Sequence, residues 1–253
     1  MLDLPNKGTI LILPSVSSAN VPQLAVDLFV NSLNIPFCSI LDHQGLLYPF
    51  AGPRESTEPV TGISSSLDVY HNEQFTCLIQ RSPTLPSSRL AFVTKIIIPL
   101  IQQNNFSRIL LLASTDALRR LNPGGPKAIA ISFLDQGNST PTILDLSRKI
   151  SRLSVQDTTT SAVQYEEYSL PGRLPGSGIT LSFLREAVKL NLPVASIILY
   201  AYDGDNFDDA VLMADMAVET LGIESPASWT PPPSWDGVYG KKPQVGLEHG
   251  LYG

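Results

Sequence analysis

The sequence is poor in the residues that build metal sites and disulfides. Its 253 residues include two cysteines and three histidines. His43, His71 and His249 lie far apart, without the spacing that places two zinc ligands on one face of a helix. Cys38 and Cys77 each lie in an apolar run and form no CxxC motif, so we expect two reduced core cysteines of a cytosolic protein. The sequence therefore predicts no metal and no cofactor.

Charge is also scarce. Charged residues make up 16% of the chain, against about 25% in an ordinary soluble domain. The net charge is −6 and the isoelectric point is near 5.0, with no cluster of lysine and arginine. Nucleic acids and anionic membranes bind through positive surfaces, so neither is an expected partner. A surface of uncharged polar residues and a surface covered by other subunits explain the low charge equally well.

Several motifs are missing as well. The first apolar run, Ile10–Leu13, ends at Pro14 and is too short for a signal peptide or a membrane span. The loop that follows it, SVSSAN, contains no glycine, which argues against a nucleotide phosphate site. The chain also has no GxSxG nucleophile motif. No catalytic constellation is predicted.

What the sequence does contain is an alternation of strands and helices, clearest in Pro175–Gly222. Val194–Tyr202 is an almost unbroken apolar run, typical of a central strand that is covered on both faces. Phe207–Leu221 repeats apolar residues every three or four positions and is predicted to be a helix. Further strands are expected at Thr9–Leu13, Ile35–Leu41, Ser66–Tyr70, Phe75–Gln80, Ser107–Ala113 and Ala128–Leu134, and further helices at 20–33, 87–103 and 181–190. Pro99 should kink or shorten the second of these helices.

This pattern predicts an α/β fold, a layered sheet with helices on both faces, formed by a single domain of residues 1–222. An extended tail of residues 223–253 follows. Within the domain, the turn Gly176–Gly178 is interpreted as a tight turn into the following helix, with an anion site as the less favoured alternative. The acidic residues after the central strand fit the dipole of the next helix better than a calcium loop.

Two helices carry more apolar surface than one buried face needs. On the helix 20–33, a second apolar stripe indicates burial on more than one side, either within its own domain or against a partner. On the helix 207–221, Leu212 and Met216 lie one turn apart on the side opposite the main stripe, which hints at a contact surface.

The tail holds both tryptophans of the chain. Trp229 and Trp235 flank TPPPS and are expected to pin an extended segment to the domain by burying large aromatic area. The chain ends in Leu251, Tyr252 and Gly253. An apolar side chain, a phenol and a free carboxylate at the end of a tether suit capture in a pocket of another protein.

Four segments, in order, resemble the family of proteasome assembly chaperone 2: SVSSANVPQLAVDL, PGSGITLSFL, YDGDNFDDA and WTPPPSW. The resemblance implies a non-enzymatic chaperone with an α/β fold that forms a heterodimer with proteasome assembly chaperone 1. The pair would bind the outer face of the 20S proteasome α-ring, promote ring assembly and block off-pathway association. Fungal members end in a hydrophobic-tyrosine-any residue motif that docks between adjacent α subunits, and here that motif maps onto Leu251, Tyr252 and Gly253.

The resemblance also gives the apolar stripes a use. We expect the heterodimer interface to draw on Val26, Phe29, Val30, Leu33, Leu212 and Met216. The expected location is the cytoplasm, with the nucleus as an alternative. A small-molecule enzyme with a nucleoside-phosphorylase-like α/β fold is the alternative function, and an interaction module of some other complex is a third.

Overall fold

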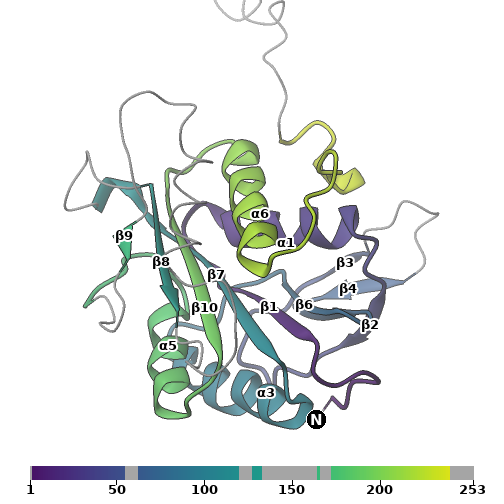
Figure 1. Ribbon diagram of the computed structural model, residues 1–253, viewed down its shortest axis with the longest axis vertical. Helices are drawn as coiled ribbons and strands as arrows, with labels where there is room; N and C mark the ends of the chain where they lie inside the picture. The colour runs from purple at the N-terminus through teal and green to yellow at the C-terminus, as the bar shows by residue number, and fades with distance from the viewer. Residues whose placement is uncertain (1, 55–61, 120–126, 133–163, 166–171, 240–253) are drawn as a thin grey trace, which may run out of the picture.

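The computed structural model describes residues 2–54, 62–119, 127–132, 164–165 and 172–239, and its centre is an eight-stranded mixed sheet in the order β2-β5-β6-β1-β7-β10-β8-β9 (Figure 1). The strands are β1 (Ile10–Pro14), β2 (Phe37–Ile40), β5 (Leu67–His71), β6 (Phe75–Gln80), β7 (Arg108–Asp116), β8 (Ala128–Ser132), β9 (Gln164–Tyr165) and β10 (Val194–Ala201). The four middle strands, β6, β1, β7 and β10, are parallel. Strands β5 and β6 form the predicted antiparallel hairpin. A separate two-stranded sheet pairs β3 (Ala51–Pro53) with β4 (Ile63–Ser65).

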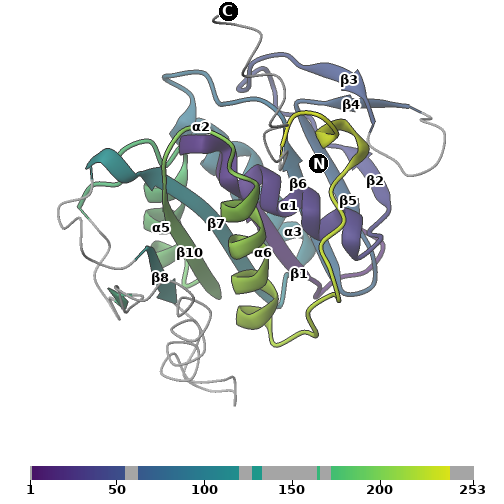
Figure 2. The same cartoon turned by 90° about the horizontal axis from the view of Figure 1, so that it is seen from above.

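Helices cover both faces of the large sheet, so the predicted layered α/β fold is confirmed (Figures 1 and 2). One face carries α1 (Val21–Ser32) and α6 (Phe207–Leu221), which pack side by side. The other face carries α2 (Arg89–Phe92), the π-helix η2 (Val93–Ile97), α3 (Ile98–Asn104) and α5 (Thr180–Lys189). Short 3-10 helices are η1 (Ser18–Asn20), η3 (Ala117–Arg119) and η5 (Pro233–Trp235).

The central strands are apolar at nearly every position because helices cover both faces of the sheet. In β1, Leu11 and Leu13 belong to the core under α3 and α5, whereas Ile12 belongs to the core under α1 and α6. Successive side chains of a strand point to opposite faces of the sheet. Because both faces are buried here, an unbroken apolar run replaces the alternation of a half-exposed strand.

The helix predicted over residues 87–103 is real but not regular. It begins at Arg89, widens into a π-helical turn at Val93–Ile97, and continues as α3 to Asn104. Pro99 has no amide hydrogen and cannot make a normal α-helical bond to the preceding turn. The wide turn next to Pro99 accommodates this lost bond without breaking the helix.

The prediction that both cysteines lie in the core is confirmed for Cys77 and wrong for Cys38. Cys77 is fully buried in β6, and burial raises the pKa of its thiol above the ordinary value. Cys38 is exposed because, in the edge strand β2, Cys38 and Ile40 point to the face that is open to solvent. The apolar sequence of this strand therefore did not show that one of its faces is exposed to solvent.

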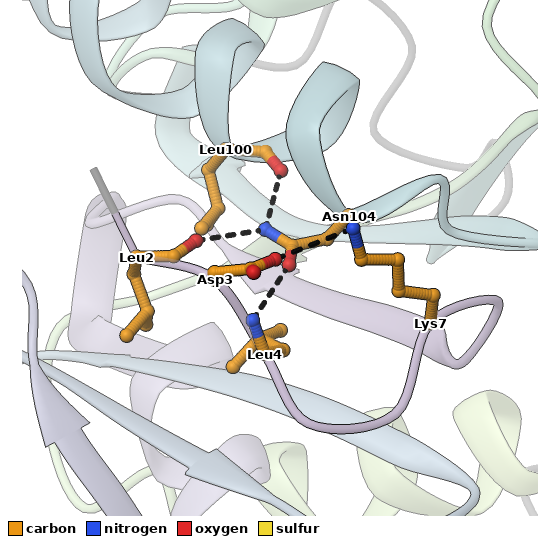
Figure 3. A network of polar contacts seen from close by, with 6 residues as sticks. All are labelled: Leu2, Asp3, Leu4, Lys7, Leu100 and Asn104. Carbon is orange, nitrogen blue, oxygen red and sulfur yellow. Dashed lines mark hydrogen bonds and ion pairs between the residues drawn. The ribbon is translucent and has the colours of Figure 1, made fainter.

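The N-terminal segment is fixed to the end of α3 by the buried side chain of Asn104 (Figure 3). Its Oδ1 accepts a hydrogen bond of 2.9 Å from the Leu4 amide, and its Nδ2 donates to the carbonyls of Leu2 and Leu100 at 3.2 and 2.9 Å. A solvent-exposed ion pair between Lys7 and Asp3, 3.3 Å long, lies beside this network.

Candidate protein-interaction site

The carboxyl ends of the parallel strands meet at one edge of the sheet, and we call this surface the carboxyl edge. It is formed by the loops after β1, β7 and β10 (residues 15–20, 117–119 and 202–206) and by the turn at residues 172–178. In open α/β sheets this edge is the usual place for binding. The carboxyl edge is therefore a candidate binding surface.

Serine side chains fasten these loops together. Ser15 Oγ donates a hydrogen bond of 2.8 Å to the Ser177 carbonyl and accepts one of 3.0 Å from the Ile179 amide. Ser17 Oγ lies 2.8 Å from Ser114 Oγ at the end of β7. The SVSSAN loop thus serves a structural purpose, because its hydroxyls satisfy backbone groups of the neighbouring turn.

Glycine is required where the two loops touch. Gly178 has φ +61°, and a Cβ there would lie 2.1 Å from the Val16 carbonyl oxygen. The amide of Ile179, which follows this glycine, is already bonded to Ser15 Oγ. The interpretation of Gly176–Gly178 as a tight turn into a helix is therefore confirmed, and the Ile179 amide already has an acceptor within the chain.

An open cavity of about 470 Å³ lies beside this turn. Asp116 and Arg119 line it and form an ion pair of 3.3 Å, and Arg173 lies on the opposite loop. A cavity with this lining offers charge pairing to a ligand. Among the residues the structure describes, no group of three or more histidine, cysteine, aspartate or glutamate side chains could hold a metal ion. No helix in the same residues is long and apolar enough to cross a membrane.

A second feature is the segment of residues 223–239, which we call the C-terminal strap. It leaves the end of α6 and crosses the outer surface of α1 and α6 (Figure 2). Trp235 is 5% exposed and packs with Leu24, Leu28 and Ala210 of the two helices. Its ring meets Phe207 edge to face at 6.0 Å and Tyr239 at 5.2 Å.

Hydrogen bonds hold the first part of the strap. The Asn31 side chain donates to the carbonyls of Thr230 and Pro231 at 2.8 and 3.1 Å. The Thr230 amide donates to Ser32 Oγ at 2.8 Å. The indole of Trp229 donates to Asp215 of α6. The prediction that the two tryptophans pin an extended segment to the domain is confirmed.

The six candidate interface residues fall into two groups. Val26, Phe29, Val30 and Met216 are buried in the core between the sheet and the two helices, whereas Leu33 and Leu212 are only partly buried. The expectation that Met216 lies on an open face of α6 is wrong, because that helix packs against both the sheet and α1. The assignment of the six to a heterodimer interface stays a prediction, and so does the division into residues 1–222 and 223–253. Leu251, Tyr252 and Gly253 lie outside the described residues.

Sequence reasoning missed a group of exposed apolar side chains on and near the edge strand β2. Exposed fractions are 50% for Ile40, 45% for Tyr48, 42% for Phe50 and 62% for Ile63. The guanidinium of Arg54 lies 3.4 Å above the ring of Phe37 in the same region. The i, i+2 spacing of Cys38 and Ile40 was the available signal, since it places both on one face of a strand.

Comparison with known proteins settles the family. Residues 11–221 match the model of the PAC2 family. The chain belongs to the PAC2 family. This agrees with the resemblance seen in the sequence, and the match ends at the last residue of α6, so that the strap lies beyond it.

Several relatives of this chain are named proteasome assembly chaperone 2. Proteasome assembly chaperone 2 of Danio rerio is 29% identical over 247 residues, and the alignment covers 92% of each chain. The protein of the same name from Homo sapiens is 26% identical over 250 residues, with the same coverage. That of Saccharomyces cerevisiae is 30% identical over 126 residues, 44% of this chain and 47% of the yeast protein.

Solved structures share the fold. The Pyrococcus furiosus protein PbaA, an archaeal homolog of proteasome-assembly chaperone, superimposes with a TM-score of 0.60 at 14% identity over 88% of this chain and 86% of its own. PbaB of the same organism, an archaeal proteasome activator, gives a TM-score of 0.52 at 12% identity over 88% of each chain. At these identities the likeness establishes the fold of this PAC2-family chain and nothing further.

Proposed function

We propose that this PAC2-family chain is a proteasome assembly chaperone that works by binding other proteins and catalyses no reaction. The observation that carries the proposal is the alignment with the chaperone of Danio rerio, which covers 92% of both chains. An alignment of this extent covers nearly the whole length of both proteins.

In this proposal the chain forms a heterodimer with proteasome assembly chaperone 1. The charged fraction of 16% suits a surface that is covered by other subunits. Leu33, which follows α1, and Leu212 of α6 are only partly buried, so they are the members of the candidate set able to touch a partner directly. Val26, Phe29, Val30 and Met216 are buried, so they would affect the interface only by holding α1 and α6 in position on the sheet.

Substitution at a partly exposed position tests this interface while leaving the fully buried side chains in place. Leu212→Glu is expected to weaken binding to the partner chaperone, while Ile40→Glu, at the exposed edge of β2, serves as the matched control. Both variants keep the buried residues intact, and binding is measured by titration with the purified partner. The opposite result, loss with Ile40→Glu alone, would move the interface to the β2 edge.

The heterodimer is proposed to bind the outer face of the proteasome α-ring through the C-terminal Leu251, Tyr252 and Gly253. The carboxylate would meet a lysine or backbone amides, the phenol would find a hydrogen bond, and the leucine would fill an apolar pocket. Docking between α subunits would promote ring assembly and block off-pathway association. The expected location of the protein is the cytoplasm, with the nucleus as an alternative.

Co-purification tests the function as a whole. Full-length protein should capture both a second chaperone chain and α subunits, and a version lacking Leu251, Tyr252 and Gly253 should keep the chaperone and lose α subunits. A version with those three residues in reversed order controls for tail length. Capture of neither partner by the full-length chain would contradict the proposal and would make a ligand screen for an enzyme the next step.

A further inference from the structure

The strap reverses the direction of the chain. Helix α6 has 15 residues and runs from the carboxyl edge to the opposite edge of the sheet, a distance of about 22 Å. The strap then returns along the same two helices. Its first anchors are Asn31 and Ser32 at the end of α1, and its last anchor, Trp235, packs on Phe207 at the start of α6. Tyr239 therefore lies back at the carboxyl edge.

Between these anchors the strap is stiff. Pro231, Pro232 and Pro233 follow Thr230 directly, and Pro232 has φ −65° and ψ 152°, an extended conformation. Proline fixes φ, and a run of prolines behaves as a semi-rigid spacer. At the C-terminal end of the strap, the rings of Phe207, Trp235 and Tyr239 pack together.

We propose that the strap is a clamp that fixes the point from which the C-terminal motif leaves the domain, and that the carboxyl edge is the surface facing the partner that captures this motif. The inference rests on the proposed function. It goes beyond it by naming which side of the domain meets the α-ring. It also assigns a positioning role to Trp235, Trp229, Asn31 and Ser32.

The position of the exit supports the assignment, because Tyr239 packs on Trp235 beside Phe207 at the carboxyl edge. From Tyr239 onward, residues 240–253 could span at most about 50 Å if fully extended, so their length alone would allow either edge to be reached. Without the clamp, the segment leading to the motif would begin at Gly222 on the opposite edge and would be roughly twice as long. Effective concentration falls as about the −3/2 power of tether length, a loss of about threefold before the change of direction is counted.

Cross-linking tests the surface on the intact protein. A benzophenone amino acid is placed at Tyr202, which is 62% exposed at the carboxyl edge, and at Leu190, which is 41% exposed after α5 on the opposite edge. In complexes with α-rings, adducts to α subunits are expected from position 202 and not from position 190. Adducts from position 190 alone would overturn the assignment of the surface.

Release of the strap tests the clamp. Asn31→Ala combined with Ser32→Ala removes three hydrogen bonds to the strap and no core side chain. Trp235→Ala removes the main apolar anchor, and Thr94→Ala, which removes an exposed hydrogen bond on the other face, is the matched control. Both strap variants should bind α-rings at least about threefold more weakly, while the control binds as the parent does.

The same variants are then compared in protein lacking Leu251, Tyr252 and Gly253. If the strap acts through the motif, the variants and their truncated parent bind equally weakly. Trp235→Ala protein that melts like the parent and binds α-rings equally well would overturn the clamp while leaving the proposed function intact. If the unaltered full-length protein binds no α-ring, the proposed function fails and this inference fails with it.

Discussion

The indole nitrogen of Trp229 lies 2.7 Å from Oδ1 of Asp215 and donates a hydrogen bond from the strap to the middle of α6. Trp229→Phe keeps an aromatic ring at this position and removes the donor. Hydrogen bonds to charged groups are worth about 1.5–3 kcal/mol, and Asp215 retains access to water, so we expect a loss of about 1–2 kcal/mol in the free energy of unfolding. Urea denaturation followed by circular dichroism measures it.

Asp215→Asn is the matched control, because the amide oxygen still accepts the bond without the charge. Its expected cost is less than half that of Trp229→Phe. Since the chain has two tryptophans, the emission of Trp229→Phe protein reports Trp235 alone. Equal stability of Trp229→Phe and parent protein would show that the bond contributes nothing.

Gly178 and Gly222 separate the cost of a clash from the cost of a left-handed backbone. Both have positive φ, +61° and +69°, but an added Cβ meets the Val16 carbonyl oxygen at 2.1 Å in the first case and nothing within 4 Å in the second. A left-handed conformation costs a non-glycine residue about 1–2 kcal/mol. We expect Gly222→Ala to lose about that much and Gly178→Ala clearly more, with a lower melting temperature.

Calorimetric melting of the two glycine variants side by side gives the comparison. Because Gly178 lies in the turn before α5 and touches the serine-rich loop at Val16, its substitution should also move the carboxyl-edge loops apart. Faster amide exchange at Ile179, whose N–H is held by Ser15 Oγ, would report that movement. Equal losses for both variants would contradict the close approach of the two loops.

The Asn104 network and the neighbouring Lys7–Asp3 ion pair should differ in their contribution to stability. Asn104→Ala leaves the buried amide of Leu4 without its acceptor, and an unsatisfied buried group costs about 1–3 kcal/mol. Lys7→Met removes an ion pair whose side chains are 52% and 66% exposed, and such pairs contribute at most about 1 kcal/mol. Chemical denaturation of both variants should therefore rank Asn104→Ala as the more damaging, and the reverse order would be inconsistent with the buried network.

The central layers of the fold were predictable because their burial follows a simple period. Val194–Ala201 and the helix Phe207–Leu221 were found within a residue of their bounds. Two covered faces make a strand apolar throughout, and one covered face makes a helix apolar every three or four residues. Local sequence suffices when each element has the environment that its pattern implies.

The features that were predicted wrongly depend on contacts between elements that lie far apart in the sequence. Met216 is buried because α1 lies beside α6, and Cys38 is exposed because it lies on the face of β2 that is open to solvent. The two tryptophans were predicted to pin the strap, but its return to the carboxyl edge is set by contacts with Asn31 and Phe207, far away in the chain. The path of an extended segment depends on where its few anchors find partners, and periodicity does not carry that information.

Stability should fall in mild acid because of His71. The side chain is 6% exposed, its Nδ1 lies 2.9 Å from Thr76 Oγ1, and its Nε2 has no hydrogen-bond partner within the described part of the chain. Burial lowers the pKa of His71 below the ordinary value of 6.5. Below pH 6.5 the unfolded chain therefore takes up a proton that the folded chain does not, so the contribution of His71 is complete above that pH and declines as the pH falls toward the folded-state pKa.

Urea denaturation at pH 7.5 and pH 5.5 tests this on the parent and on His71→Gln, which titrates nothing at this position. Between the two conditions the parent should lose up to about 1 kcal/mol more than the variant, because one proton per pH unit corresponds to about 1.4 kcal/mol. Groups that titrate elsewhere cancel in the comparison. Parallel losses in the two proteins would mean that His71 is accessible enough to bind its proton in the folded state.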